Sequence, residues 1–96
     1  MSTFDFVREQ EVILEHFGIE AQIEKFFEEV EELREAIKLK NKVMIREELA
    51  DVHNVLMQLI FHFGIRVIYK KAIEKVERTK QRIKEGYYDR QRNDTM

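Results

Sequence analysis

Four acidic residues form two pairs whose spacing could do chemistry. Glu29 stands three positions before Glu32, and Glu48 stands three positions before Asp51. On a helix, residues three apart lie one turn apart on the same face. Both pairs border the apolar side of their predicted helices, where carboxylates that are dry and unpaired are costly. If the two pairs faced each other, they would supply four hard oxygen ligands suited to Mg²⁺ or Mn²⁺.

The alternative is that these carboxylates are solvated and paired with lysine and arginine, and spacing alone leaves both possibilities open. The other acidic residues of the same segment point mostly away from its apolar face and are expected in solvent: Glu24, Glu28, Glu31 and Glu35. A di-iron site of the ferritin type would need Glu-x-x-His pairs, and none of the three histidines follows a glutamate at that spacing. No histidine is expected to be a ligand.

A basic stripe near the end of the chain could bind phosphate. It comprises Lys71, Lys75, Arg78 and Arg82, at helical spacing. Acidic neighbours at Glu74, Glu77 and Glu85 weaken its positive field, and a solvated face is the alternative interpretation.

The elements that must position these residues are helices. Apolar residues recur at helical spacing over residues 3–17, 19–40, 43–63 and 65–85. Gly18, Gly64 and Gly86 each follow one of these segments, where a left-handed helix cap favours glycine. The pattern predicts an all-α protein, a four-helix antiparallel bundle in a single domain over residues 1–86. Residues 87–96 are polar and lose the periodicity, which predicts a flexible tail.

Composition excludes several other classes. The 96 residues include no cysteine, no proline and three glycines, too few turn formers for a β-sandwich and no thiol for a disulfide or zinc scaffold. A net charge of -2 gives no general attraction to nucleic-acid polymers or to an anionic membrane. The sequence shows neither a signal peptide nor a membrane span, so a cytoplasmic location is expected. A domain of this size is marginal alone, and self-association is expected.

The residues resemble the MazG-like nucleotide pyrophosphohydrolases of the all-α NTP pyrophosphatase superfamily. The family motif is Glu-Glu-x-x-Glu, a gap, and then Glu-x-x-Asp. Residues 28–33 match the first half, residues 48–52 match the second, and residues 75–83 are similar to the basic helix that follows. Larger relatives often carry an asparagine two residues before the lysine of that helix, where this chain has Ile73.

The resemblance implies hydrolysis of a nucleoside or deoxynucleoside triphosphate to its monophosphate and pyrophosphate. It implies Mg²⁺, with Mn²⁺ as a possible substitute, bound by Glu29, Glu32, Glu48 and Asp51. Glu28 would orient water or act as an outer-shell ligand, and Glu48 would share the catalytic role. Lys75 and Arg78 would neutralise the pyrophosphate. A homodimer or homotetramer is implied as well.

Two further residues are candidates for contacts to the base. Gln22 lies on the same stripe as Glu29, and Asn54 follows Asp51 by one turn. Two alternatives stay open at this stage. One is phosphoribosyl-ATP pyrophosphohydrolase, which looks similar in its acidic helices. The other is a noncatalytic helical module that binds a partner.

Overall fold

The chain folds entirely into helices in the part that the structure, a computed structural model, describes: residues 1–87. The helices are α1 (Thr3–Phe17), α2 (Ile19–Lys38), α3 (Lys42–Phe63) and α4 (Ile65–Lys84). The all-α prediction is confirmed, and each predicted boundary lies within two residues of the observed one. The predicted flexible tail falls almost wholly on residues 88–96, which lie outside the described residues.

Local sequence signals explain where the helices begin and end. The Ser2 hydroxyl accepts a hydrogen bond from the Asp5 N–H at 3.1 Å, and the Asp5 carboxylate accepts one from the Ser2 N–H, which forms a capping box. Asn41 caps α3 by accepting from the Met44 N–H at 3.1 Å. Gly18 and Gly64 have φ values of 86° and 111°, a region that side chains disfavour, and each separates two helices.

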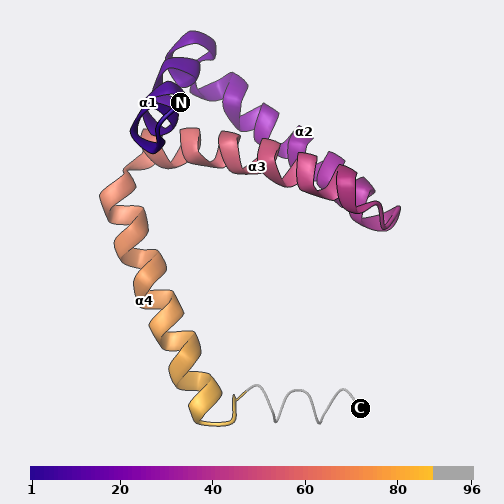
Figure 1. Cartoon of the computed structure of the whole chain (residues 1–96). Coiled ribbons are helices and arrows are strands. Elements are labelled where there is room, and N and C mark those ends of the chain that lie inside the picture. The colour runs from indigo at the N-terminus through magenta and orange to yellow at the C-terminus, as the bar shows by residue number, and fades with distance from the viewer. Residues whose placement is uncertain (88–96) are drawn as a thin grey trace. The chain divides into compact units, whose positions relative to one another are not determined.

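Residues 1–63 form one compact unit, and Gly64 begins a second. In the first unit α2 and α3 run side by side in opposite directions, and α1 packs on both of them near one end of this pair (Figure 1). The contact between α2 and α3 is the most extensive one in the unit. It therefore decides which side chains are buried together.

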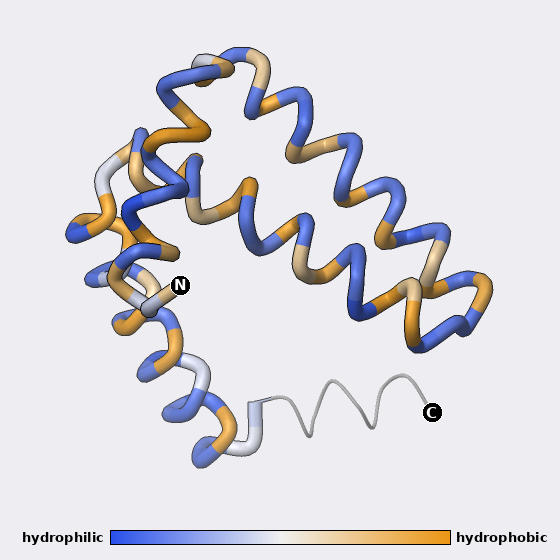
Figure 2. Tube along the Cα trace, turned by 45° about the horizontal axis from the view of Figure 1, so that its top comes forward, coloured by the Kyte–Doolittle hydropathy of each residue, from blue (hydrophilic) through white to orange (hydrophobic). Residues whose placement is uncertain are grey.

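The surface along which α2 and α3 meet, here called the seam, is largely polar. On α2 its buried residues are Gln22, Glu29 and Ala36, seven positions apart. On α3 they are Val55 and Gln58. Apolar residues recur along every helix (Figure 2), and many of them are open to solvent.

The second unit contains α4, and none of its described residues is buried. Arg82 lies over the ring of Tyr87, with 5.2 Å from the guanidinium carbon to the ring centre. Among the described helices, none alone has the length and apolar composition needed to cross a membrane, and only α3 and α4 counted together meet that test.

Candidate metal centre and ligand pocket

Glu29 is a buried carboxylate with one bound and one free oxygen. Its position on the seam leaves it 5% exposed. One oxygen, Oε1, lies 3.1 Å from the ammonium of Lys25, one turn earlier on α2. The other oxygen, Oε2, is buried without a hydrogen-bond partner. A buried acceptor of this kind is expensive unless something supplies positive charge or a proton.

Glu48 of α3 is a second carboxylate with an unpaired oxygen. Its Oε2 is buried without a hydrogen-bond partner. Burial raises the pKa of Glu48 to about 7, and the nearby carboxylates of Glu32 and Glu29 contribute to the same shift. Around neutral pH, a proton therefore compensates for the missing positive charge.

Glu29, Glu48 and Asp51 form an acidic triad. One carboxylate oxygen from each lies within 4.8 Å of the other two. Three carboxylates at this separation, two of which carry a buried and unpartnered oxygen, fit a divalent cation such as Mg²⁺. The triad thus brings together three of the four ligands predicted from the sequence.

The fourth predicted ligand, Glu32, is not part of the triad. Its side chain is exposed, yet its charge is one of the main causes of the raised Glu48 pKa, so it lies at the rim of the cluster. Glu28, predicted to orient water, is also exposed and lies 3.8 Å from the Lys25 ammonium. The expectation that Glu28 faces solvent is confirmed, whereas its catalytic role stays a prediction.

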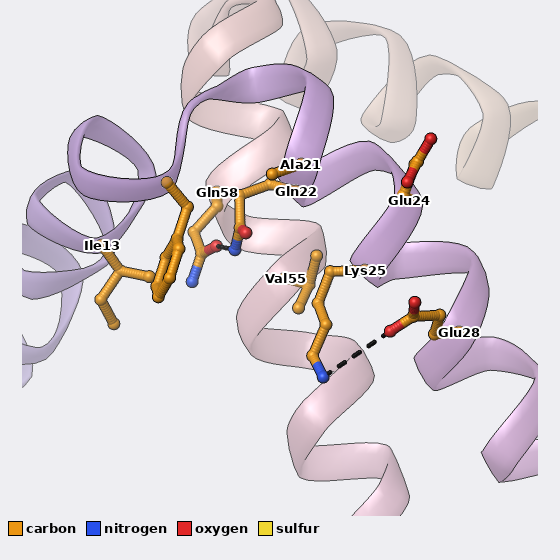
Figure 3. A pocket seen from close by; sticks show the side chains of 9 residues that line it. Ile13, Ala21, Gln22, Glu24, Lys25, Glu28, Val55 and Gln58 are labelled. Atoms are coloured by element: carbon orange, nitrogen blue, oxygen red, sulfur yellow. Dashed lines mark hydrogen bonds and ion pairs between the residues drawn. The ribbon is translucent and has the colours of Figure 1, made fainter.

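A pocket of about 480 Å³ lies beside the triad. Its walls come from all three helices of the first unit: Ile13 and Phe17 of α1, Ala21, Gln22, Glu24, Lys25 and Glu28 of α2, and Val55 and Gln58 of α3 (Figure 3). Lys25 belongs to both sites, because it lines the pocket and pairs with Glu29 of the triad. A ligand in the pocket can therefore extend toward the acidic residues.

Buried side-chain amides form a chain of hydrogen bonds behind this pocket. Gln22 Nε2 donates to Gln58 Oε1, and Gln58 Nε2 donates to Gln10 Oε1 at 2.8 Å. Gln10 Nε2 then donates to Asn54 Oδ1 at 3.0 Å. The three glutamines are 2–6% exposed. This amide chain connects α2, α3 and α1.

The structure places the two predicted base-contact residues differently. Gln22 lines the pocket, whereas Asn54 does not line it and is linked to it through Gln10 and Gln58. Sequence reasoning missed Gln10, Gln58 and Lys25. Gln58 does carry a signal, since it is the only polar residue between Val55 and Phe61 in the apolar half of α3. Gln10 carries none, because it stands among other polar residues.

Lys75 and Arg78, predicted to bind phosphate, lie on α4 in the second unit. Both side chains are exposed. Their exposure fits a solvated face as well as a phosphate site, so their role stays a prediction.

Comparison with known proteins identifies the family. Residues 17–85 match the model of the MazG nucleotide pyrophosphohydrolase domain. The chain belongs to the MazG family. An uncharacterized protein of Archaeoglobus fulgidus is 38% identical over 58 residues, which cover 60% of this chain and 62% of that protein. No solved structure matches the chain.

Membership of the MazG family implies nucleotide pyrophosphohydrolase chemistry and confirms the resemblance noted in the sequence. The matched range contains the whole acidic triad and α4. It leaves out α1 except for Phe17. Gln10 and Ile13 are thus contributed to the pocket region of this MazG chain by a segment outside the family model.

Proposed function

We propose that this chain is a Mg²⁺-dependent nucleoside triphosphate pyrophosphohydrolase. Water would add to the α-phosphorus of a ribonucleotide or deoxynucleotide, and the bond to the bridging oxygen would break, giving the monophosphate and pyrophosphate. One observation supports this most strongly: in a MazG-family chain, two buried carboxylate oxygens without partners meet a third carboxylate beside a pocket. A cation satisfies carboxylates in that state without a proton.

Glu29, Glu48 and Asp51 would hold the metal, and Glu32 at the rim would add a fourth carboxylate. Bound there, Mg²⁺ or its substitute Mn²⁺ supplies charge stabilisation for phosphate oxygens and lowers the pKa of a coordinated water. The residues of the chain provide the rest. Glu29 is buried, Glu48 is half-buried and Asp51 is exposed, and the negative charge of four carboxylates selects a cation rather than a neutral ligand.

The pocket next to the triad would hold the nucleoside part of the substrate. Gln22 offers an amide to the base, and Asn54 supports it through the amide chain. Lys25 stands between pocket and triad, where an ammonium can meet a phosphate that approaches the metal. Glu28, on the open side of the pocket, would orient water, and Lys75 and Arg78 of α4 would neutralise the leaving pyrophosphate.

The chain would work as a homodimer or homotetramer. Of its described apolar residues only Ala36 and Val55 are buried, while Phe27 is 65% and Leu49 is 50% exposed. A second copy of the chain offers the same apolar faces and can cover them by symmetry. A folded domain with so few buried apolar side chains is hard to stabilise by itself.

The test is a substrate panel. Release of pyrophosphate and of the matching monophosphate is measured for NTPs, dNTPs and phosphoribosyl-ATP with Mg²⁺, Mn²⁺ and EDTA. We expect metal-dependent pyrophosphate release that is lost in Glu48→Gln and kept in Glu31→Gln, whose parent residue is exposed on α2. Orthophosphate as the product would contradict cleavage at the α-phosphate.

The panel also separates the two alternatives. Activity on phosphoribosyl-ATP alone would assign the chain to that hydrolase. No hydrolysis of any substrate, together with a melting temperature that Mg²⁺ and Mn²⁺ leave unchanged, would favour the noncatalytic module.

A further inference from the structure

The amide chain has a direction. All three hydrogen bonds of the amide chain run the same way, from the donor Gln22 through Gln58 and Gln10 to the acceptor Asn54. Each amide has an oxygen that only accepts and a nitrogen that only donates. Turning one amide inside the chain would set oxygen against oxygen or nitrogen against nitrogen. The amides must therefore keep their direction together or reverse it together.

This direction decides what the pocket offers to a ligand. Gln22 is the member that begins the chain at the pocket, and its nitrogen faces Gln58 with its oxygen turned away from that partner (Figure 3). The hydrogen bonds described for Gln22 use only its nitrogen. Its oxygen is thus the acceptor left for a molecule in the pocket. A reversed chain would leave a nitrogen, a donor, in its place.

The residue that holds the middle of the chain comes from α1. Gln10 is 3% exposed, accepts from Gln58 and donates to Asn54, so it uses both ends of its amide. Without Gln10 the amides of Gln58 and Gln22 would still pair, but their direction would no longer be tied to that of Asn54. Buried amide networks of this kind specify one arrangement when every member is satisfied.

We propose that Gln10 is a positioning residue for the pocket: through Gln58 it fixes Gln22 with its carbonyl oxygen available to the ligand. The ligand class this selects is a nucleotide whose base presents an N–H group, amino or imino, to that oxygen. The inference rests on the proposed function and deepens it, because it assigns base selection to a contact made by α1. A purely structural Gln10 would stabilise the fold without affecting which base is preferred.

The experiment compares bases that differ only in this donor. Binding of dAMP, dCMP, dGMP and dUMP with Mg²⁺ is measured by calorimetry, and each is paired with an analogue methylated at every N–H of its base: N6,N6-dimethyl-dAMP, N4,N4-dimethyl-dCMP, N1,N2,N2-trimethyl-dGMP and N3-methyl-dUMP. For the tightest of the four we expect methylation to weaken binding to the wild type by about tenfold or more. We call the factor by which methylation weakens binding the methylation ratio. Because the bulk of the methyl group affects every variant, only the difference in methylation ratio between variants is interpreted.

Gln10→Met removes both ends of the amide while keeping the length of the side chain. We expect the methylation ratio to fall from about tenfold to about twofold, with the Mg²⁺-induced rise in melting temperature unchanged. KM for the preferred triphosphate should rise relative to the others while kcat stays within about twofold. If Gln10→Met does not fold, Asn54→Leu takes its place, since it removes the acceptor of the Gln10 nitrogen.

Two further variants act as controls. Glu31→Gln alters an exposed residue of α2 outside the amide chain, so its methylation ratio should be that of the wild type. Gln22→Met removes the acceptor itself, so the effect of methylation on affinity through this contact should disappear. Adding Gln10→Met to Gln22→Met should then change nothing further, because Gln10 acts through Gln22.

The possible failures are distinguishable. If Gln10→Met weakens all nucleotides equally and leaves the methylation ratio at its wild-type value, Gln10 is structural and the inference is overturned, while the pyrophosphohydrolase assignment stands. If wild-type affinity does not change when the N–H is methylated, the pocket does not recognise an N–H donor on the base, and the inference also fails. If the wild type binds none of the four monophosphates, the pocket does not hold a base through this contact and the inference fails, whereas the proposed function is tested separately by pyrophosphate release.

Discussion

At the scale of single residues, Glu48 combines two opposed properties. It is buried among other carboxylates, which raises its pKa to about 7, and it offers an unpartnered oxygen that a cation would satisfy. Replacing it with glutamine removes the charge and preserves the shape. We expect Glu48→Gln to lose about 100-fold or more of the activity and most of the stabilisation by Mg²⁺. In EDTA its free energy of unfolding should equal or exceed that of the wild type, because a repulsive charge is gone.

The measurements are pyrophosphate release and thermal melts with Mg²⁺ and with EDTA. Glu31→Gln is the control, since that side chain is exposed on α2 and changes the net charge by the same amount. A Glu48→Gln chain that Mg²⁺ still stabilises as much as the wild type would show that Glu48 is not a ligand.

The raised pKa of Glu48 also predicts how stability depends on pH in the absence of metal. The ordinary pKa of 4.5 applies to the unfolded chain, and the folded chain holds this proton up to about pH 7. Between these values the folded state binds more protons than the unfolded state, so its stability should fall as pH rises from about 4.5 to about 7. Urea unfolding in EDTA across this window measures the slope.

Glu48→Gln provides the comparison, and we expect its slope in this window to be smaller. Saturating Mg²⁺ should also reduce the wild-type slope, since a bound cation takes the place of the proton. An identical slope in both proteins would mean that Glu48 does not carry the extra proton.

Sequence reasoning reached some site residues and missed others for a physical reason. Glu29 and Asp51 could be found because two i, i+3 acidic pairs form a recognisable pattern on helices. Gln10 matters through Gln58, which is 48 positions away in the sequence, and no local pattern records such a pairing. Glu32 is left out of the triad although its carboxylate contributes to the raised pKa of Glu48, so its omission depends on side-chain placement, which helical periodicity does not determine.

At the scale of elements, Ala36 is the most deeply buried side chain described in the seam between α2 and α3. This residue is fully buried, at 0% exposure, near the end of α2 where the two helices approach their connection. A larger side chain there must push the helices apart, which typically costs about 1–3 kcal/mol. We therefore expect Ala36→Leu to lower the free energy of unfolding by about that amount, as measured by urea denaturation.

Ala50→Leu serves as the matched change. Ala50 is exposed on α3, so the same enlargement should alter the free energy of unfolding by less than about 0.5 kcal/mol. Equal effects at both positions would argue against close packing of α2 on α3 at Ala36.

Element boundaries were predictable from the sequence, but the packing of the elements was not. The capping serine, the glycines and the apolar spacing are local features, and they gave α1 over its observed range, Thr3–Phe17. Periodicity also located the most apolar side of α3, yet Val55 and Gln58, not Leu49, are its buried residues. A hydrophobic pattern reveals which face avoids water and carries no information about what covers it.

At the scale of the whole molecule, the apolar side chains exposed to solvent are the main unfavourable feature of a single chain. Phe27 on α2 is 65% exposed, and Phe63 on α3 is 63% exposed. In a protein that acts as a monomer, replacing such a side chain with serine would have little effect on stability. In a dimer or tetramer the same residue would sit in an interface, and its loss would cost about 2 kcal/mol or more.

Phe27→Ser therefore separates the two cases. We expect the wild type to elute as a dimer or tetramer in size-exclusion chromatography with light scattering, and Phe27→Ser to shift toward monomer with a lower and concentration-dependent melting temperature. Val12→Ser, which alters a 50% exposed residue of α1, controls for the general loss of apolar surface. If wild type and Phe27→Ser are both monomers of equal stability, the faces of α2 and α3 do not bind a second copy.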